Sequence, residues 1–265
     1  MKTFIVMIFV WCIGISAFAA DVTDGQRWNV YGKTGWFSWK ETIDGKPLIS
    51  DDGPMVAIGA TRNDRVYKAL SIRETVEVWG GNVRYDGHDI FNSVPIKGNS
   101  TYLGTREEVR ADVGIPVTTT ITVNPFVGIE HKFWVRSKEG EIWNTFTVPI
   151  GATVVMRLSA LQLFVEGGMK APIATWNSQT LANYGFDDII VRPKAQIGSF
   201  IGAGLRNTSW DVSLIYEEMR FSPSDLVPGR KKSGNSGLVS VYTGTFFFQP
   251  ESKTSTLWLK IGYNF

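Results

Sequence analysis

Cysteine and histidine are nearly absent from this chain of 265 residues, which has one cysteine, Cys12, and two histidines, His88 and His131. Cys12 lies within the first twenty residues, so the remainder of the chain can form no disulfide and no thiolate zinc site. Two histidines are too few for a dedicated transition-metal site. We therefore expect neither a metal nor another cofactor.

A strong excess of charge of one sign is also absent. The chain has 27 basic and 25 acidic residues, and only Lys2 of these lies in the first twenty positions. Nucleic-acid-binding proteins carry concentrated basic surfaces. We therefore expect no nucleic-acid partner.

Long hydrophobic runs are missing after residue 20, since no later segment approaches the run of about 20 apolar residues that a membrane helix needs. The first stretch has Lys2, an apolar core and then small residues around Ala17 and Ala19, which is typical of a secretory signal peptide. Small residues are required at the first and third positions before the cut, so we expect cleavage after Ala19. The alternative, an uncleaved anchor, would need a longer apolar core. Lipid attachment would need a cysteine at the junction, whereas Cys12 follows three bulky residues.

No linker or change in composition divides the rest of the chain. We expect residues 1–19 to be the leader and residues 20–265 to form one domain.

Alternation of apolar and polar residues with a period of two is what the sequence has in abundance. The last eleven residues, STLWLKIGYNF, place Leu257, Leu259, Ile261, Tyr263 and Phe265 on one face of a strand. The other face carries Trp258 and Lys260. Residues 106–115, 125–136, 188–206 and 208–217 repeat this pattern, with charges on the second face.

Such strands fit a membrane barrel better than a soluble sandwich, because the charged face would be stranded in an apolar core. In a closed barrel the apolar side chains face lipid, the charges face the lumen, and closure satisfies the backbone hydrogen bonds. A helix is excluded by the period of two. The sequence therefore predicts an all-β fold, a closed antiparallel transmembrane β-barrel.

The pattern predicts ten strands, with eight or twelve as alternatives. The expected ranges are 28–42, 54–62, 66–80, 100–117, 122–137, 141–152, 157–170, 188–206, 208–221 and 255–265. Residues 239–248, VSVYTGTFFF, are themselves strand-like and can extend the barrel above the membrane. Tight periplasmic turns are expected at RND near residue 63 and at RNTS near residue 207.

The ending at Tyr263 and Phe265 resembles the assembly signal of bacterial outer-membrane proteins, in which a final alternating strand closes with an aromatic residue. The chain as a whole resembles the small outer-membrane β-barrel proteins, of the opacity or surface-antigen type and the neighbouring narrow porins. The resemblance implies a Gram-negative outer membrane, periplasmic termini, contact with membrane lipid and lipopolysaccharide, and insertion by the barrel-assembly machinery. It names no partner for the extracellular loops and carries over no site residues.

The inner face is the candidate functional region, as a channel lining or as a plug. Its predicted charges are Arg73, Glu77, Glu108, Arg110, Asp112, Glu130, Lys132, Arg136, Glu166, Lys170, Arg192, Lys194, Asp211, Glu217 and Lys260. Barrels of eight strands are filled by side chains, whereas barrels of sixteen or more leave an aqueous channel. Charges of mixed sign in a lumen of ten strands should therefore pair across it.

The aromatic residues near the expected strand ends are interpreted as girdles at the two membrane interfaces. They are Trp36, Trp39, Trp79, Trp134, Trp143, Trp210, Tyr216, Tyr263 and Phe265.

The sequence matches known catalytic motifs of outer-membrane enzymes only weakly. Asp86, Gly87, His88 and Asp89 superficially resemble the Asp-x-His unit of the omptin proteases, with the adjacent Asp51 and Asp52 as an acidic pair. Here the unit lies in an early loop, and Asp-Gly is a common turn pair. His131 is followed two positions later by Phe133, so the serine nucleophile of lipid A deacylases is missing, and alternation places this histidine on the outer face.

We therefore predict a barrel without catalysis that has a structural or surface-interaction role. A narrow passive channel for small polar solutes is the first alternative. An outer-membrane hydrolase with an active site at the rim is the second.

Overall fold

The computed structural model describes residues 27–88, 94–138, 140–182, 185–233 and 239–265. The expected leader and its cleavage after Ala19 lie outside the described residues.

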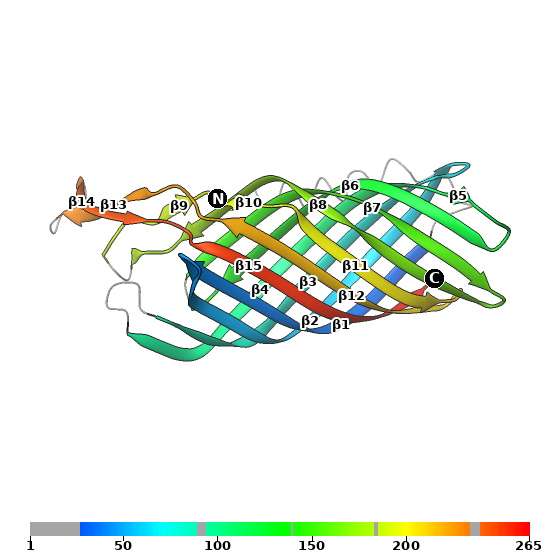
Figure 1. Cartoon of the computed structure of the whole chain (residues 1–265), viewed down its shortest axis with the longest axis horizontal. Coiled ribbons are helices and arrows are strands. Elements are labelled where there is room, and N and C mark those ends of the chain that lie inside the picture. Colours follow the sequence, from blue (N-terminus) through cyan, green and yellow to red (C-terminus); the bar gives the residue numbers. More distant parts are fainter. Residues whose placement is uncertain (1–26, 89–93, 139, 183–184, 234–238) are drawn as a thin grey trace.

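Ten strands form one closed antiparallel wall, as the alternation predicted. They are β1 (Arg27–Ile43), β2 (Lys46–Tyr67), β3 (Leu70–His88), β4 (Pro95–Val113), β6 (Ile121–Arg136), β7 (Glu141–Leu158), β8 (Leu161–Gln179), β11 (Gly198–Arg206), β12 (Trp210–Ser222) and β15 (Glu251–Asn264). The last strand, β15, pairs with β1 on one side and with β12 on the other, which closes the barrel. Figure 1 shows these strands running obliquely to the long axis, with the C-terminus at one end.

Five short strands complete the secondary structure: β5 (Ile115–Pro116), β9 (Ile189–Val191), β10 (Lys194–Ala195), β13 (Val227–Ser233) and β14 (Val239–Phe247). β13 and β14 pair with each other as a separate hairpin, which lies beyond the end of the barrel opposite the C-terminus (Figure 1). The prediction that residues 239–248 are strand-like is thus confirmed by β14. No helix in the described part of the chain is long and apolar enough to cross a membrane.

The period of two separates an apolar outer surface from a polar interior. On β15, Leu257, Leu259, Ile261 and Tyr263 are exposed, whereas Trp258 is buried in the lumen. The same exposure of large apolar side chains recurs around the wall, at Val56, Ile58, Val78, Leu103, Val109, Ile129, Ile150, Val165, Ile201 and Leu214. This distribution of apolar and polar side chains is the inverse of that in a soluble protein. It matches a barrel whose outer surface contacts the lipid hydrocarbon.

Several strands are longer than predicted, because turns are shorter than the loop-like composition indicates. Asp44 and Gly45 have φ of 51° and 74°, and two left-handed residues make the tight turn that suits a β-hairpin. As a result Asp51 and Asp52 lie inside β2 and not in a loop. The prediction of a turn at RND is also wrong. Arg62 lies within β2, and the chain reverses at residues 68–69.

The RNTS turn is confirmed between β11 and β12. There the Asn207 side-chain oxygen accepts hydrogen bonds from the backbone N–H groups of Ser209 and Trp210, both at 2.8 Å.

The strand predicted over residues 188–206 is broken into β9, β10 and β11. The ladder between β8 and β11 ends at the pair Lys170–Gly198, and β8 pairs again with β9 at Asn177–Val191. Pro193, which has no N–H to donate, lies in this interruption. Between Ala195 and Ile197 the alternation changes phase, because Ala195 packs against the interior and Ile197 is exposed.

Glycines on the inner face make room for large neighbours. A Cβ on Gly104 would clash with the carbonyl oxygen of Phe133 and lie 2.7 Å from the Trp79 ring, so Trp79 lies directly over this glycine. Gly151 makes the same space for Phe126, 2.7 Å from its virtual Cβ. By contrast, a Cβ on the outward Gly32 would approach only the Ala57 carbonyl, at 4.0 Å.

Replacing Gly104 with Ala should therefore destabilise the barrel by about 1–3 kcal/mol, because Trp79 and the backbone of β6 would have to shift. The matched Gly32→Ala variant should change the free energy of unfolding by less than about 1 kcal/mol. Urea unfolding of refolded protein in detergent micelles measures both. Equal stability of the two variants would contradict the close packing over Gly104.

Candidate functional site in the lumen

Thirteen of the fifteen predicted inner charges lie on the lumen side of their strands. They are Arg73, Glu77, Glu108, Arg110, Asp112, Glu130, Lys132, Arg136, Glu166, Lys170, Asp211, Glu217 and Lys260. Each shares its face with buried cross-strand neighbours. The strand register therefore brings them together within one enclosed space.

Arg192 and Lys194 were predicted to face the lumen, and this prediction is wrong. Both point out of the barrel. The partner of Val191 in the ladder is the fully buried Asn177, so the next residue, Arg192, faces outward and is exposed. Ala195 pairs with the buried Phe221, so Lys194 also faces outward, with a side chain 73% exposed. The phase changes between Ala195 and Ile197, so the residues before this point have the opposite parity to the one that the sequence pattern assumed.

Inward charges missing from the predicted set include Lys33, Glu41, Asp51, Arg106 and Glu141. Arg106 lies on the same face of β4 as Glu108 and Arg110, so the same alternation could have predicted that it faces the lumen. Asp51 was hidden by its assignment to a loop. Lys33, Glu41 and Glu141 lie in strands whose alternation was not worked out.

A first ion-pair network lies near the C-terminal end of the barrel. Arg110 contacts Asp112 at 3.0 Å and Glu166 at 2.8 Å, and Arg73 is 3.6 Å from Glu166. Thr153 donates a further hydrogen bond to Glu166 at 2.8 Å. Two cations thus face two carboxylates, beside the separate pair Lys260–Asp211 at 3.1 Å.

A second network fills the middle of the lumen. Arg106 contacts Glu108 at 2.7 Å and Glu130 at 2.6 Å. Lys170 reaches Glu130 at 2.9 Å and Glu217 at 3.0 Å, and Lys132 reaches Glu217 at 2.8 Å. The pair Lys33–Glu77 at 2.6 Å completes it. Four cations are matched by four carboxylates, so this layer carries no net formal charge.

An aromatic layer lies above the second network, toward the end opposite the C-terminus. The rings of Trp134 and Trp143 stack at 5.3 Å with an interplanar angle of 6°, and Trp39 meets Trp143 edge-on at 5.1 Å. Phe221 packs against Trp143 at 5.2 Å. Trp39, Trp134 and Trp143 are no more than 5% exposed.

The girdle interpretation is therefore wrong for Trp39, Trp134 and Trp143, and also for Trp79, which packs against this layer. Trp36, Trp210, Tyr216, Tyr263 and Phe265 do lie on the outside, with 37–68% exposure.

A cluster of three carboxylates around one guanidinium lies next to the aromatic layer. Arg136, fully buried, contacts Glu41 at 2.7 Å, Glu141 at 2.8 Å and Asp51 at 3.0 Å. Trp39 and Trp143 donate their indole N–H groups to Glu41 and Glu141, both at 2.8 Å, and the Tyr102 hydroxyl donates to Asp51 at 2.5 Å. The aromatic layer and the carboxylate cluster are thus one hydrogen-bonded unit.

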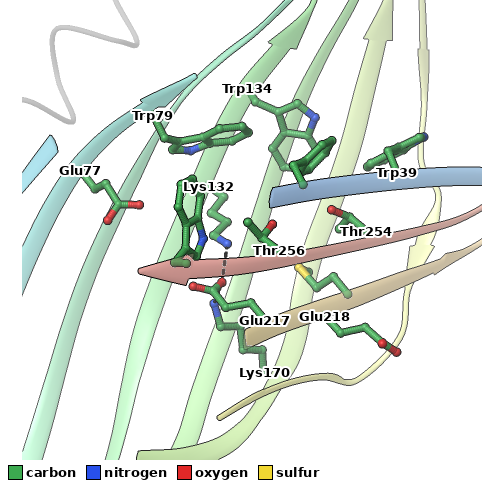
Figure 2. Close-up of a pocket in the computed structure, with 13 residues that line it drawn as sticks. Trp39, Glu77, Trp79, Lys132, Trp134, Lys170, Glu217, Glu218, Thr254 and Thr256 are labelled. Atoms are coloured by element: carbon green, nitrogen blue, oxygen red, sulfur yellow. Dashed lines mark hydrogen bonds and ion pairs between the residues drawn. The ribbon is translucent and has the colours of Figure 1, made fainter. Parts of the chain in front are cut away.

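A small cavity separates the aromatic layer from the second network. Figure 2 shows Trp79 and Trp134 on one side of it and the ion pair of Lys132 with Glu217 on the other. Its volume is about 60 Å³. Since one water needs about 10–15 Å³ of such volume, the cavity has room for a few waters.

The rim residues are spread over two faces. Asp51 points into the lumen, whereas Asp52, Asp86 and His88 line a groove of about 280 Å³ on the outer side of β2 and β3. Asp86 lies 3.4 Å from Lys97, and His88 Nδ1 lies 3.4 Å from the Leu48 carbonyl oxygen. Asp89 lies outside the described residues. Over the described ranges, no three acidic, histidine or cysteine side chains gather closely enough to hold a metal.

His131 lies on the outer face, where alternation placed it. Its Nδ1 is 2.9 Å from Glu107, its Nε2 is 3.2 Å from the Asn144 side chain, and its ring stacks on Phe146 at 4.4 Å. The side chains of His131 and Glu107 are 13% and 19% exposed. A satisfied polar group within the wall accounts for this histidine.

No protein-family model and no curated protein sequence matches this chain. Among solved structures, the outer membrane protease OmpT from Escherichia coli superposes with a TM-score of 0.57 and 11% identity, over 91% of this chain and 97% of OmpT. The chain has the fold of the small outer-membrane β-barrel proteins. At this identity the likeness to OmpT extends to the barrel alone.

Two further outer-membrane barrels are less similar to this one. The translocator domain of the autotransporter NalP from Neisseria meningitidis has a TM-score of 0.36 and 10% identity, over 100% of this chain and 97% of that domain. Ail, the attachment invasion locus protein of Yersinia pestis, has a TM-score of 0.30 and 12% identity, over 92% of this chain and 100% of Ail.

Replacing Arg136 with Met should destabilise the barrel by about 3–5 kcal/mol, because Glu41, Asp51 and Glu141 would lose the cation that contacts all three. Urea unfolding in micelles measures this. The exposed Arg192→Met is the matched control and should change the free energy of unfolding by about 0.5 kcal/mol or less. Adding Glu41→Gln and Asp51→Asn to Arg136→Met should recover part of the loss. Equal stability of the two single variants would show that the cluster is not held by Arg136.

Proposed function

We propose that this protein is an integral outer-membrane barrel that does not conduct solutes, has no catalytic activity, and acts through structural and surface contacts. The observation that carries the proposal is the filled lumen. Two ion-pair networks, an aromatic layer and the Arg136 cluster follow one another along the axis, and Trp143, Arg136 and Asn177 are fully buried inside a barrel. A permeation path would have to break several of these contacts at once.

Placement in the outer membrane is supported by the exposed apolar wall and by the fold it shares with outer-membrane barrels. The periplasmic location of both barrel termini is part of the proposal. The reversals at residues 68–69, 159–160 and 207–209 are short and lie at the same end as the C-terminus, whereas the opposite end carries long strand extensions and the hairpin. Short turns face the periplasm in this class of barrel.

Surface contact is assigned to the end that carries the β13–β14 hairpin. Phe186, Ile189, Val191 and Phe247 form an apolar cluster that fixes the adjoining loop. Leu226 and Phe246 are 62% and 55% exposed at this end. Exposed apolar side chains next to a packed apolar cluster are suited to contact with another protein.

A narrow channel for small polar solutes is the first alternative, and the cavity beside Lys132 is the feature that favours it. We give it second place because the cavity is bounded by ion pairs on one side and stacked indoles on the other. A rim hydrolase is less well supported, since Asp51 is held by Arg136 and Tyr102 away from the outer groove.

In planar bilayers the refolded protein should give no single-channel steps, because the two ion-pair networks and the aromatic layer cross the lumen. The Arg192→Glu variant, altered on the outside, should be equally silent. Discrete steps from the unmodified protein would contradict the proposal. If their ion preference changed in Arg110→Glu but not in Arg192→Glu, the channel alternative would replace it.

The proposed orientation predicts labelling from outside the cell at the hairpin. A single cysteine placed at Lys231 should react with a membrane-impermeant maleimide on intact cells, whereas one at Ser159 should react only after the outer membrane is permeabilised. Cys12 is the only native cysteine, so the unmodified protein serves as the background. The reverse order of labelling would invert the orientation.

A further inference from the structure

A row of arginines lies on the lumen side of β1, β2 and β3, near the end of the barrel that carries the C-terminus. Arg27 is the cross-strand partner of Asn63, and Asn63 is the partner of Arg73. All three share the face of Asn29, whose side chain donates to the lumen residue Asp211 at 2.6 Å. The strand register therefore places a guanidinium group on either side of one amide, inside the mouth of the barrel.

A second row repeats this arrangement on β7, β8 and β11. Arg157 is the partner of Gln162, and Gln162 is the partner of Arg206. The Arg206 guanidinium donates to the Gln162 side-chain oxygen at 3.0 Å and lies over the Phe164 ring, 5.5 Å from its centre. The central strands of the two rows, β2 and β8, are five strands apart in the closed order of ten. The two rows, which we call the arginine rows, therefore lie on opposite walls of the lumen.

The arginine rows have few carboxylate partners. Arg27, Arg157 and Arg206 form no ion pair with any described residue. Arg73 reaches Glu166 only at 3.6 Å. Arg206 is close enough to Arg27 and Arg73 for their charges to repel one another. Since Arg27 and Arg157 are exposed at the mouth, an anion arriving from solvent would meet them first.

The carboxylates on the lumen side near this end contact other cations more closely. Asp112 and Glu166 contact Arg110 at 3.0 Å and 2.8 Å. Asp211 contacts Lys260 at 3.1 Å. These two cations are enclosed deeper in the lumen than the exposed arginines of the mouth. The arginine rows are therefore left with an excess of positive charge among the described residues.

Carboxylates on the outer face do not remove this excess. Asp64 contacts the outward Arg62 at 2.8 Å, and Glu74 is the cross-strand partner of the same arginine. The C-terminal residue, Phe265, is 68% exposed on the outer wall. These acidic groups lie on the other side of the sheet from the arginine rows.

Two hydrogen-bond acceptors beside the first row also need partners. The side-chain oxygens of Asn29 and Asn63 are buried and accept no hydrogen bond from any described residue. A buried acceptor without a donor costs free energy, which an N–H group would recover. The mouth therefore combines guanidinium groups that attract an anion with amide oxygens that attract a donor.

We propose that the arginine rows bind a carboxylate-rich peptide of the periplasm. The proposal rests on the proposed function only for the orientation, which makes this mouth the periplasmic one. A guanidinium group binds a carboxylate through two parallel hydrogen bonds, and a peptide also supplies N–H groups to the amide oxygens. Inorganic phosphate supplies the charge without those N–H groups. The opposite mouth, where Glu41, Asp51 and Glu141 surround Arg136, would repel the same ligand.

The test measures binding of a fluorescein-labelled hexaglutamate peptide to the refolded protein in nonionic micelles, by fluorescence anisotropy. The variant carries Arg27→Gln, Arg157→Gln and Arg206→Gln. The control carries Arg84→Gln, Arg192→Gln and Arg220→Gln, which remove the same charge from the outer wall. Each exposed ion pair contributes about a threefold gain in affinity, so the variant should bind about thirtyfold more weakly, while the control keeps its affinity. Thermal unfolding followed by circular dichroism verifies that both are folded.

A single substitution tests the amide oxygen separately from the charge. Asn63→Ala should weaken binding of hexaglutamate about threefold, the effect of one hydrogen bond. The affinity for tripolyphosphate, which has no N–H group to donate, should stay unchanged. An equal loss for both ligands would overturn the role of Asn63 as an acceptor from the peptide.

Equal binding by the arginine variant and its control would overturn the proposal, and so would equal binding of a hexaglutamine peptide. Tripolyphosphate binding as tight as that of hexaglutamate would overturn the assignment to a peptide. Asp21 and Asp24 precede Arg27 in the sequence and lie outside the described residues. Binding seen only after Asp21→Asn and Asp24→Asn would assign the arginine rows to the chain's own N-terminal segment and overturn the separate partner.

The binding test is independent of the tests of the proposed function, because it is carried out in micelles. A conducting or inverted barrel that binds hexaglutamate through the arginine rows would refute the proposed function and leave this site standing. A silent barrel in the proposed orientation that does not bind the peptide would do the opposite.

Discussion

Charge compensation inside a narrow tube is the constraint on which the structure depends. Ten strands enclose a space that side chains can span, so a charge on one strand reaches a partner on a distant strand. Lys170 of β8 meets both Glu130 of β6 and Glu217 of β12. In this low-dielectric interior an unpaired ion would be costly. The register of the whole sheet is thereby fixed, because a shift by one residue would turn the cations toward lipid.

Ionic and aromatic layers perform complementary tasks along the axis. The ionic layers match charge almost residue for residue, whereas the aromatic layer fills the volume that ion pairs leave open. They are linked where Trp39 and Trp143 donate to Glu41 and Glu141. Glycines such as Gly104 supply the space that the rings occupy. The interior resembles the packed core of a soluble protein more than the lining of a pore, and the outer wall takes over the apolar surface.

Much of the fold followed from the two-residue rhythm, since alternation depends only on the pleat of a strand. It placed Glu108, Arg110, Glu130 and Lys170 in the lumen and gave the number of strands. It failed where the alternation changes phase, between Ala195 and Ile197, and so misplaced Arg192 and Lys194, which lie before that point. It also missed Asp51, because acidic and glycine residues resemble a loop whether or not the strand continues through them.

The alternation could have located part of the aromatic layer, because Trp134 shares the inner face with Lys132 and Arg136, and the girdle interpretation overrode it. The stacking of the rings and the pairing of charges were out of reach for another reason. The partners within the ionic layers depend on closure and on the radius of the barrel. The 40 residues between Lys170 and Glu130, or the 85 between Arg136 and Asp51, carry no local signal of their contact.

The separation of the β13–β14 hairpin from the wall sets where the chain is free to vary. Because these two strands pair with each other and contribute nothing to closure, lengthening or exchanging them leaves the circumference of the tube unchanged. Insertions and substitutions should thus be tolerated at this point while the wall of the barrel keeps its register.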